Sequence, residues 1–183
     1  ARDAIGAAFD EPLAVAAFLV VTALLLWSAE RRRTTLGTSE PASDDRTSVS
    51  GELDALPWSR AVGIGAAQAL AILPGVSRSG ATISAGMALG LSRGAAARLS
   101  FLMLLPVTVG AALVTLPDLG TPEPGAIAFD ATSIALGVLV SAVSGYLAIR
   151  FLIGFVARRR LTVFVPYVLA LAALLAVAAL VRT

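Results

Sequence analysis

One arginine lies within a long apolar stretch and is surrounded by hydroxyl groups and glycines. Arg78 is the only charged residue between Ala61 and Leu91, in the segment Leu-Pro-Gly-Val-Ser-Arg-Ser-Gly-Ala-Thr-Ile. A charge at bilayer depth costs about 2.5–3.5 kcal/mol on insertion scales, so such residues usually face a protein interior and have a function. A guanidinium group, hydroxyls and open backbone N–H groups together bind oxyanions, and phosphate is the anion we expect here.

The residues around this arginine have the chemistry of a phosphate site. Arg78 offers a planar fork that fits two phosphate oxygens. Ser77 and Ser79 can donate hydrogen bonds to the anion, or one of them could attack it. Ser79 is the expected N-cap of a helix over 81–91, whose first N–H groups and dipole attract anions, with Thr82 in the first turn.

Other residues of the stretch have structural as well as functional interpretations. Gly75 and Gly80 permit close backbone approach, and Gln68 faces either a partner helix or the cavity. Arg78 could instead form a structural ion pair or extend to the membrane surface. Small residues usually mark close helix packing, and Ser84 is expected to pack or to bond its own backbone; the glycines concerned are Gly63, Gly65, Gly86 and Gly90.

The composition is that of an integral membrane protein. Hydrophobic residues make up 57% of the 183 residues and charged residues 14%, with a mean hydropathy of +0.87. The chain has no cysteine, so disulfides and thiol chemistry are excluded. It also has no histidine, which removes the commonest general base and metal ligand.

The apolar segments predict an all-α polytopic fold with about four spanning helices and one re-entrant hairpin. Segment 61–91 would be about 46 Å long as one helix, against a hydrocarbon core of about 30 Å. Pro74-Gly75 and Gly80 divide it into two helices too short to cross alone, which is typical of a re-entrant hairpin; one kinked spanning helix is the alternative. The predicted spans are 12–29, 95–116 with a kink at Pro106, 131–157 and 162–181, and the predicted polar loops are 34–58 and 117–130.

Loop charges predict the orientation. Arginines flank the predicted spans at 31–33, 93, 98 and 158–160, whereas loop 117–130 has none, so the arginine-rich ends should be cytoplasmic. All the arginine-rich ends can be cytoplasmic only if segment 61–91 enters and leaves the membrane on the same side. Arg150 is expected to extend toward the cytoplasmic face.

Residues 66–106 resemble the C-terminal signature of the undecaprenyl-diphosphate phosphatase family, also called the bacitracin-resistance protein family. The resemblance rests on Ala67 to Ile83, on Gly-Leu-Ser-Arg at 90–93 and on Ala-Ala-Ala-Arg-Leu-Ser-Phe at 95–101. It implies hydrolysis of undecaprenyl diphosphate to the monophosphate and inorganic phosphate, which recycles the lipid carrier for cell-wall peptidoglycan synthesis and gives bacitracin resistance. It also implies a multi-pass plasma-membrane protein built from inverted repeats. The expected cofactor is a divalent cation (Mg²⁺ or Ca²⁺), and the expected partner is a polyprenyl diphosphate lipid and no nucleic acid. A homodimer is also considered.

On the matching positions, the resemblance implies that Arg78 holds the diphosphate while Ser77 and Thr82 are site hydroxyls. Ser79 and Gly80 would line the phosphate loop, and we add Gly75 and Gln68 as substrate-binding candidates. The family's glutamate-rich hairpin with its histidine does not occur in these residues. We expect it upstream of Ala1, together with the metal ligands, so that these 183 residues alone would be inactive.

Two rival functions remain open from the residues themselves. Broken helices directed at a mid-membrane anion are also found in secondary transporters, so a transporter or flippase for a phosphate-bearing lipid or anion is the first. The second is a membrane partner without catalysis. A carboxylate and histidine pair upstream of Ala1 would favour the enzyme over both.

Overall fold

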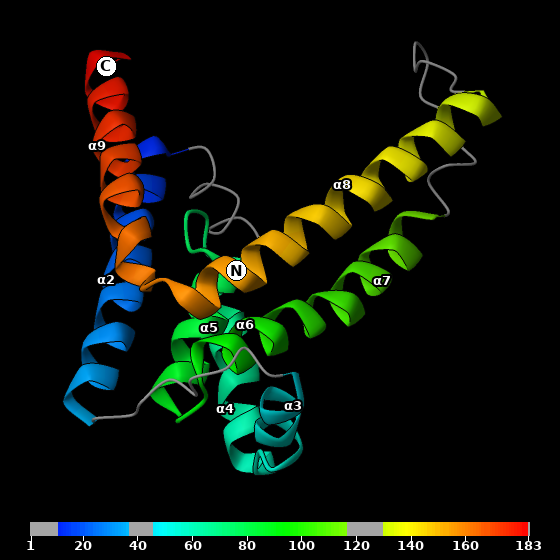
Figure 1. The fold of residues 1–183 in the computed structure, drawn as a ribbon. Helices are drawn as coiled ribbons and strands as arrows, with labels where there is room; N and C mark the ends of the chain where they lie inside the picture. Colours follow the sequence, from blue (N-terminus) through cyan, green and yellow to red (C-terminus); the bar gives the residue numbers. More distant parts are fainter. Residues whose placement is uncertain (1–10, 37–45, 117–129, 183) are drawn as a thin grey trace.

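A computed structural model describes residues 11–36, 46–116 and 130–182, and these residues form helices without any strand (Figure 1). The all-helical prediction is therefore confirmed for the described part of the chain. The helices are α2 (Pro12–Leu36), α3 (Arg46–Asp54), α4 (Trp58–Ala69), η1 (Leu70–Ile72), α5 (Arg78–Ala88), α6 (Arg93–Leu102), α7 (Leu104–Thr115), α8 (Ala131–Arg158), η3 (Leu161–Phe164) and α9 (Val165–Arg182).

Among the described residues, four stretches are long and apolar enough to cross a membrane. They coincide with the four predicted spans and run over Pro12–Arg32, Arg93–Thr115, Ala131–Arg158 and Leu161–Val181. The apolar run that was expected to end at Ala29 continues as helix α2 through the following arginines, to Leu36. In Figure 1, α2 and α9 lie side by side, and the two helices are in contact over much of their length.

The stretch around Arg78 forms a helical hairpin whose tip is a turn. Helix α4 and the short η1 lead into the turn at Leu73–Val76, and α5 leads back out. Pro74 cannot continue a helix, and Gly75 has φ +94°, a left-handed conformation that L side chains rarely adopt. The two arms pack on each other, and α5 also packs against α2 and α6. The predicted break at Pro74-Gly75 agrees with the structure, whereas the predicted break at Gly80 is wrong, because Gly80 lies inside helix α5.

The span over 93–115 is broken where a proline removes a backbone donor. Helix α6 ends at Leu102, Met103 forms a turn, and α7 begins at Leu104. Pro106 has no N–H for the carbonyl of Leu102, four residues before it, and its ring crowds that carbonyl. The kink expected at Pro106 therefore occurs one turn earlier, at the carbonyl that loses its partner.

The polar segment over 34–58 is not a plain loop. Its part Arg46–Asp54 forms helix α3, which packs on α6. Val49 is buried in the core with 4% of its surface exposed. Glu52 accepts a 2.8 Å hydrogen bond from the N–H of Ser92, the N-cap of α6. A short segment rich in polar residues thus covers one end of the core and caps a helix, which its composition alone did not indicate.

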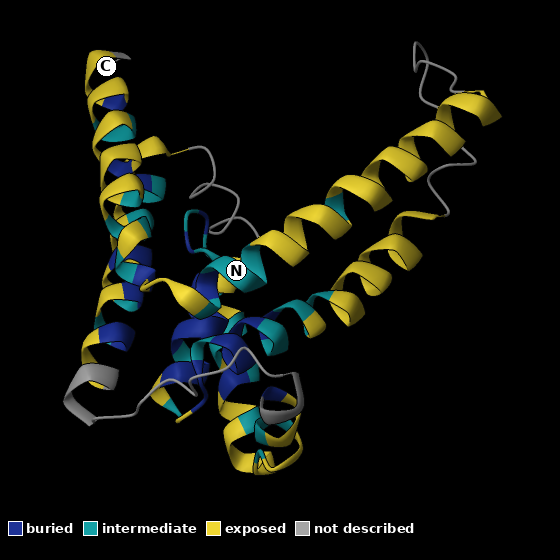
Figure 2. Ribbon diagram, in the orientation of Figure 1, coloured by how far each residue is buried: buried dark blue, intermediate teal, exposed yellow. Residues whose placement is uncertain are grey.

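Helices α7 and α8 extend away from the other helices (Figure 1) and are almost entirely exposed over their outer parts (Figure 2). Many of their exposed side chains are large and apolar, as expected for a surface in contact with lipid. Asp130 caps the outer end of α8, where its Oδ1 accepts from the N–H of Ser133 at 3.1 Å. Hydrogen bonds from the side chain and backbone of Ser133 hold the pKa of Asp130 below its ordinary value.

Candidate functional site

Ser77, not Ser79, caps the helix that begins at the hairpin tip. Its Oγ accepts a 3.1 Å hydrogen bond from the N–H of Gly80, and its backbone is extended before α5 starts at Arg78. The helix therefore starts three residues earlier than the sequence predicted, because Arg78 and Ser79 already have helical conformations. Arg78 and Ser79 are consequently in the first turn, where backbone N–H groups lack intrahelical partners.

This first turn presents unused donors beside a cation. The amides of Arg78 and Ser79 have no hydrogen-bond partner among the described residues, and the Arg78 guanidinium has none either. Ser79 is exposed and Arg78 is half-buried, so a ligand can approach them. Ser77 Oγ and Ser79 Oγ lie 3.4 Å apart, close enough to bind one anion together. A guanidinium, two amides and two hydroxyls at a helix N-terminus make an oxyanion site.

A threonine from α2 holds the turn in place. Thr22 is 2% exposed, its hydroxyl donates to the carbonyl of Gly75 at 3.1 Å, and it accepts from the N–H of Ser77 at 3.0 Å. Gly75 packs so closely on α2 that a Cβ there would lie 2.5 Å from the carbonyl oxygen of Val15. Sequence reasoning missed Thr22, and the signal for it was a hydroxyl residue near the middle of the apolar run after Pro12.

Replacing Thr22 by valine should loosen the tip. The shape is kept, but the N–H of Ser77 and the carbonyl of Gly75 both lose their partner, at about 1–3 kcal/mol for each buried group left unsatisfied. We expect a lower unfolding temperature in detergent and weaker binding of phosphate-bearing lipid. Thr22→Ser, which retains the hydroxyl, is the matched control. Wild-type stability and binding in Thr22→Val would contradict this role.

Thr82 lies behind the tip rather than on its open side. It is 1% exposed, and its hydroxyl contacts the carbonyl oxygens of Arg78 and Ser79 at 2.9 and 3.3 Å. It also shares a 2.7 Å hydrogen bond with Ser100 of α6. These contacts fix the first turn of α5 from inside. A role for Thr82 as a site hydroxyl stays a prediction, and substrate would reach it only after the turn moves.

The remaining candidates differ in how near they lie to the donors. Gly80 is buried, and a Cβ there would lie 3.0 Å from the Cβ of Ser77 and so push on the cap. Gln68 lies on α4, about two turns before the tip, and is half-buried; its side chain has no hydrogen bond among the described residues. Both orientations of Gln68, toward the cavity or toward a partner helix, therefore stay predictions.

Three of the residues given structural interpretations have defined surroundings in the structure. Gly86 is at a close helix contact, since a Cβ there would lie 3.1 Å from the Cβ of Ala96. Gly90 instead ends α5 with φ +101°, as the helix closes with a bond from the N–H of Leu91 to Gly86. Ser84 is buried, and its hydroxyl has no hydrogen-bond partner in the described part of the chain, so it does not bond its own backbone.

A buried ion pair anchors the other end of the hairpin region. Glu30 of α2 is 2% exposed and pairs with Arg93 at the start of α6. Its Oε2 also accepts from the N–H of Leu161 at 3.3 Å. The predicted span 12–29 stopped short of Glu30, but the span of α2 runs to Arg32 and includes it; the partner of Glu30 makes its burial tolerable.

The described residues at the tip do not fit a divalent cation. The described parts of the chain contain no group of three His, Cys, Asp or Glu side chains placed to hold a metal ion. The groups at the tip are a guanidinium, hydroxyls and backbone amides, which favour an anion, whereas Mg²⁺ and Ca²⁺ prefer carboxylate and carbonyl oxygens. The residues of the tip can therefore bind the phosphate groups of a ligand.

Comparison with known proteins agrees with this chemistry. A family model described as bacitracin resistance protein BacA matches residues 1–174. The undecaprenyl-diphosphatase of Methanothermobacter thermautotrophicus is 40% identical over 180 residues, covering 98% of this chain and 91% of that protein. The undecaprenyl-diphosphatase of Rubrobacter xylanophilus is 54% identical over 119 residues, covering 65% of this chain and 43% of that protein. The chain is a membrane protein of the bacitracin resistance protein BacA family.

Proposed function

We propose that the protein hydrolyses undecaprenyl diphosphate to undecaprenyl phosphate and inorganic phosphate, with the diphosphate bound at the tip of the α4–α5 hairpin. The observation that carries the proposal is the set of unused donors at that tip: the Arg78 guanidinium and the amides of Arg78 and Ser79. The names of the two relatives and the family match support the substrate and the reaction.

The depth of the tip supports a lipid-linked substrate. Thr22, which binds the turn directly, is near the middle of the 21-residue span Pro12–Arg32. At 1.5 Å per residue it lies about 15 Å from either end of that span, which is the centre of a hydrocarbon core of about 30 Å. Both arms of the hairpin then start and finish on the side of Glu30 and Arg93. We therefore interpret 58–88 as a re-entrant hairpin, one element of an inverted-repeat architecture.

The tip can stabilise the charge that grows on the transferred phosphoryl group. In the overall reaction, the oxygen of a water molecule becomes part of the released phosphate, the bond from the terminal phosphorus to the bridging oxygen breaks, and the bridging oxygen stays on the lipid monophosphate. Arg78 and the amides of the first turn of α5 would bind the non-bridging oxygens, where low dielectric and fixed geometry make each donor effective. Ser77 and Ser79 would orient the same group; the nucleophile is left unassigned among them and water.

We place the protein in the plasma membrane and infer that the reaction uses a divalent cation, Mg²⁺ or Ca²⁺, whose ligands are not the residues of this tip. The reaction recycles the lipid carrier for cell-wall synthesis. Cells that lose the reaction should become sensitive to bacitracin. A homodimer stays a prediction, for which the exposed apolar faces of α7 and α8 offer a surface.

Phosphate release tests the function directly. Protein expressed from its complete coding sequence and purified in detergent should release inorganic phosphate from a C55 polyprenyl diphosphate but not from the C55 monophosphate. EDTA should abolish the release, and added Mg²⁺ or Ca²⁺ should restore it. No release from a correctly folded preparation would overturn the phosphatase assignment. Transbilayer movement of a phosphate-bearing lipid in reconstituted vesicles would then identify a flippase.

A further inference from the structure

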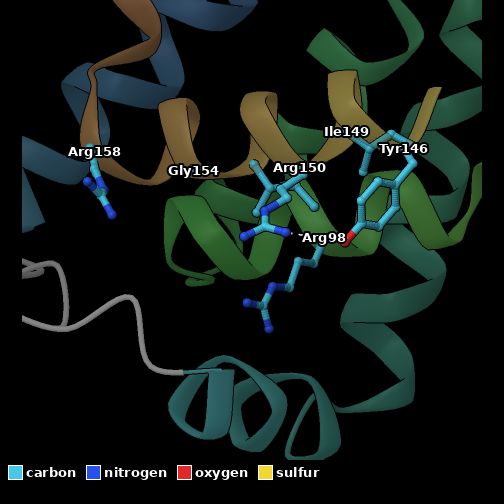
Figure 3. A pocket seen from close by; sticks show the side chains of 7 residues that line it. Arg98, Tyr146, Ile149, Arg150, Gly154 and Arg158 are labelled. Carbon is cyan, nitrogen blue, oxygen red and sulfur yellow. Dashed lines mark hydrogen bonds between the residues drawn. The ribbon is translucent and has the colours of Figure 1, made fainter. Parts of the chain in front are cut away.

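A second concentration of positive charge lies away from the hairpin tip, between α6 and α8. A cavity of about 590 Å³ is lined by three arginines, one tyrosine and small or aliphatic residues. Its walls contain no carboxylate, and the two helices that form it are in contact. Figure 3 shows the side chains of Arg98, from α6, and Arg150, from α8, at this cavity, with Arg158 further along α8.

The three arginines have no anionic partner in the described part of the chain. None of Arg98, Arg150 and Arg158 forms an ion pair with a described residue. Arg150 donates only a long 3.4 Å hydrogen bond to the hydroxyl of Tyr146, one turn before it on α8. Like charges that share a cavity without a counter-ion repel one another, and a bound anion would remove that repulsion. Guanidinium groups from two helices suit an anion with several oxygens, such as phosphate.

The position of the cavity indicates where that phosphate comes from. Arg158 ends α8, and Arg150 lies two turns earlier, about 12 Å deeper along the helix. The cavity therefore spans the boundary between headgroups and acyl chains, in the arginine-rich and hence cytoplasmic leaflet. A neighbouring cavity of about 520 Å³ shares Arg150 and Arg158 but is lined otherwise by apolar residues that include Phe151 and Phe155. Charged and apolar walls side by side fit a lipid better than a free ion.

We propose that this cavity binds the phosphate of an anionic phospholipid headgroup, with the acyl chains along the apolar side of α8. The site is separate from the tip around Arg78, and the proposal does not rest on the function proposed there. A lipid bound here would bridge α6 and α8, and α8 is otherwise exposed along most of its length. It would thus hold the outer helices against the part of the protein that positions the tip.

Native mass spectrometry of detergent-purified protein would test the site, with phosphatidylglycerol as the probe and phosphatidylcholine for comparison. We expect phosphatidylglycerol to be retained in preference, and Arg98→Gln or Arg150→Gln to weaken its binding about fivefold each, as a basic residue near a membrane surface typically contributes. Arg159→Gln is the matched control, because Arg159 is exposed close by but does not line the cavity. Arg150→Lys should retain more binding than Arg150→Gln.

Three results would overturn the proposal. Equal retention of the two lipids would show that the cavity does not select an anion. An equal loss in Arg159→Gln would show that diffuse surface charge, rather than the cavity, attracts the lipid. Competition by inorganic phosphate at the concentration of the lipid would show a site for a free anion instead. Elution of each variant at the wild-type volume on gel filtration establishes that the comparison is between folded proteins.

Discussion

Replacing Arg78 by alanine should reduce phosphate release from C55 polyprenyl diphosphate by about 10²–10³-fold, the loss typical of removing one preorganised donor from a charged transition state. Arg78 has no structural partner in the described part of the chain, so its removal breaks no ion pair or hydrogen bond. The fold should therefore survive while the activity is lost. The measurement is kcat/KM by released phosphate, beside the thermal unfolding temperature of the same preparation.

Arg78→Lys separates charge from geometry at the same position. Lysine keeps the positive charge but has no planar fork for two oxygens, so its activity should fall between those of wild type and Arg78→Ala. Arg60→Ala is the control, because Arg60 is an exposed arginine on the same hairpin, at the far end of α4 from the tip. Arg78→Ala with wild-type kcat/KM would refute the placement of the diphosphate at this tip. A parallel loss in Arg60→Ala would point to a general effect of surface charge.

Local chemistry explains which parts of the fold could be predicted. Span boundaries follow from apolar length, and the break in segment 61–91 follows from Pro74-Gly75, where one residue cannot continue a helix and the next has a positive φ. These are properties of neighbouring residues, so the sequence carries them directly. The start of α5 was misplaced by three residues because Ser77 and Ser79 are both good N-caps, and only the turn geometry selects the first.

The contacts that position the site were not predictable in the same way. Thr22 is 55 residues from Ser77 along the chain, and Ser100 is 18 residues from Thr82. Nothing in the periodicity of α2 indicates which hydroxyl meets which turn. The role of α3 was missed for a related reason: its polar composition gives no sign that Val49 is buried or that the carboxylate of Glu52 caps α6. Support by distant residues depends on helix packing, which a single sequence leaves unspecified.

Glu30 should be the residue whose replacement most destabilises the fold. It is buried, it pairs with Arg93, and it accepts from the N–H of Leu161, so it joins α2 to α6 and to η3. Glu30→Gln would remove the carboxylate that pairs with Arg93, and breaking a buried pair from one side typically costs about 3–5 kcal/mol. Because 14% of the Arg93 side chain remains exposed, we expect the lower part of that range. Thermal unfolding monitored by size exclusion in detergent would measure it.

A double-mutant cycle distinguishes the pair from two independent contributions. The cost of a one-sided change comes mainly from the charge left behind, so Glu30→Gln with Arg93→Gln should be less destabilising than the sum of the two single variants. Glu11→Gln is the control, since Glu11 is exposed at the start of α2. Additive losses would mean that the two side chains act separately. Because α2 also carries Thr22, loss of the pair should loosen the turn at Gly75. Phosphate release should therefore fall even when it is assayed at temperatures well below the unfolding temperature of the variant. Arg60→Ala should not have this effect.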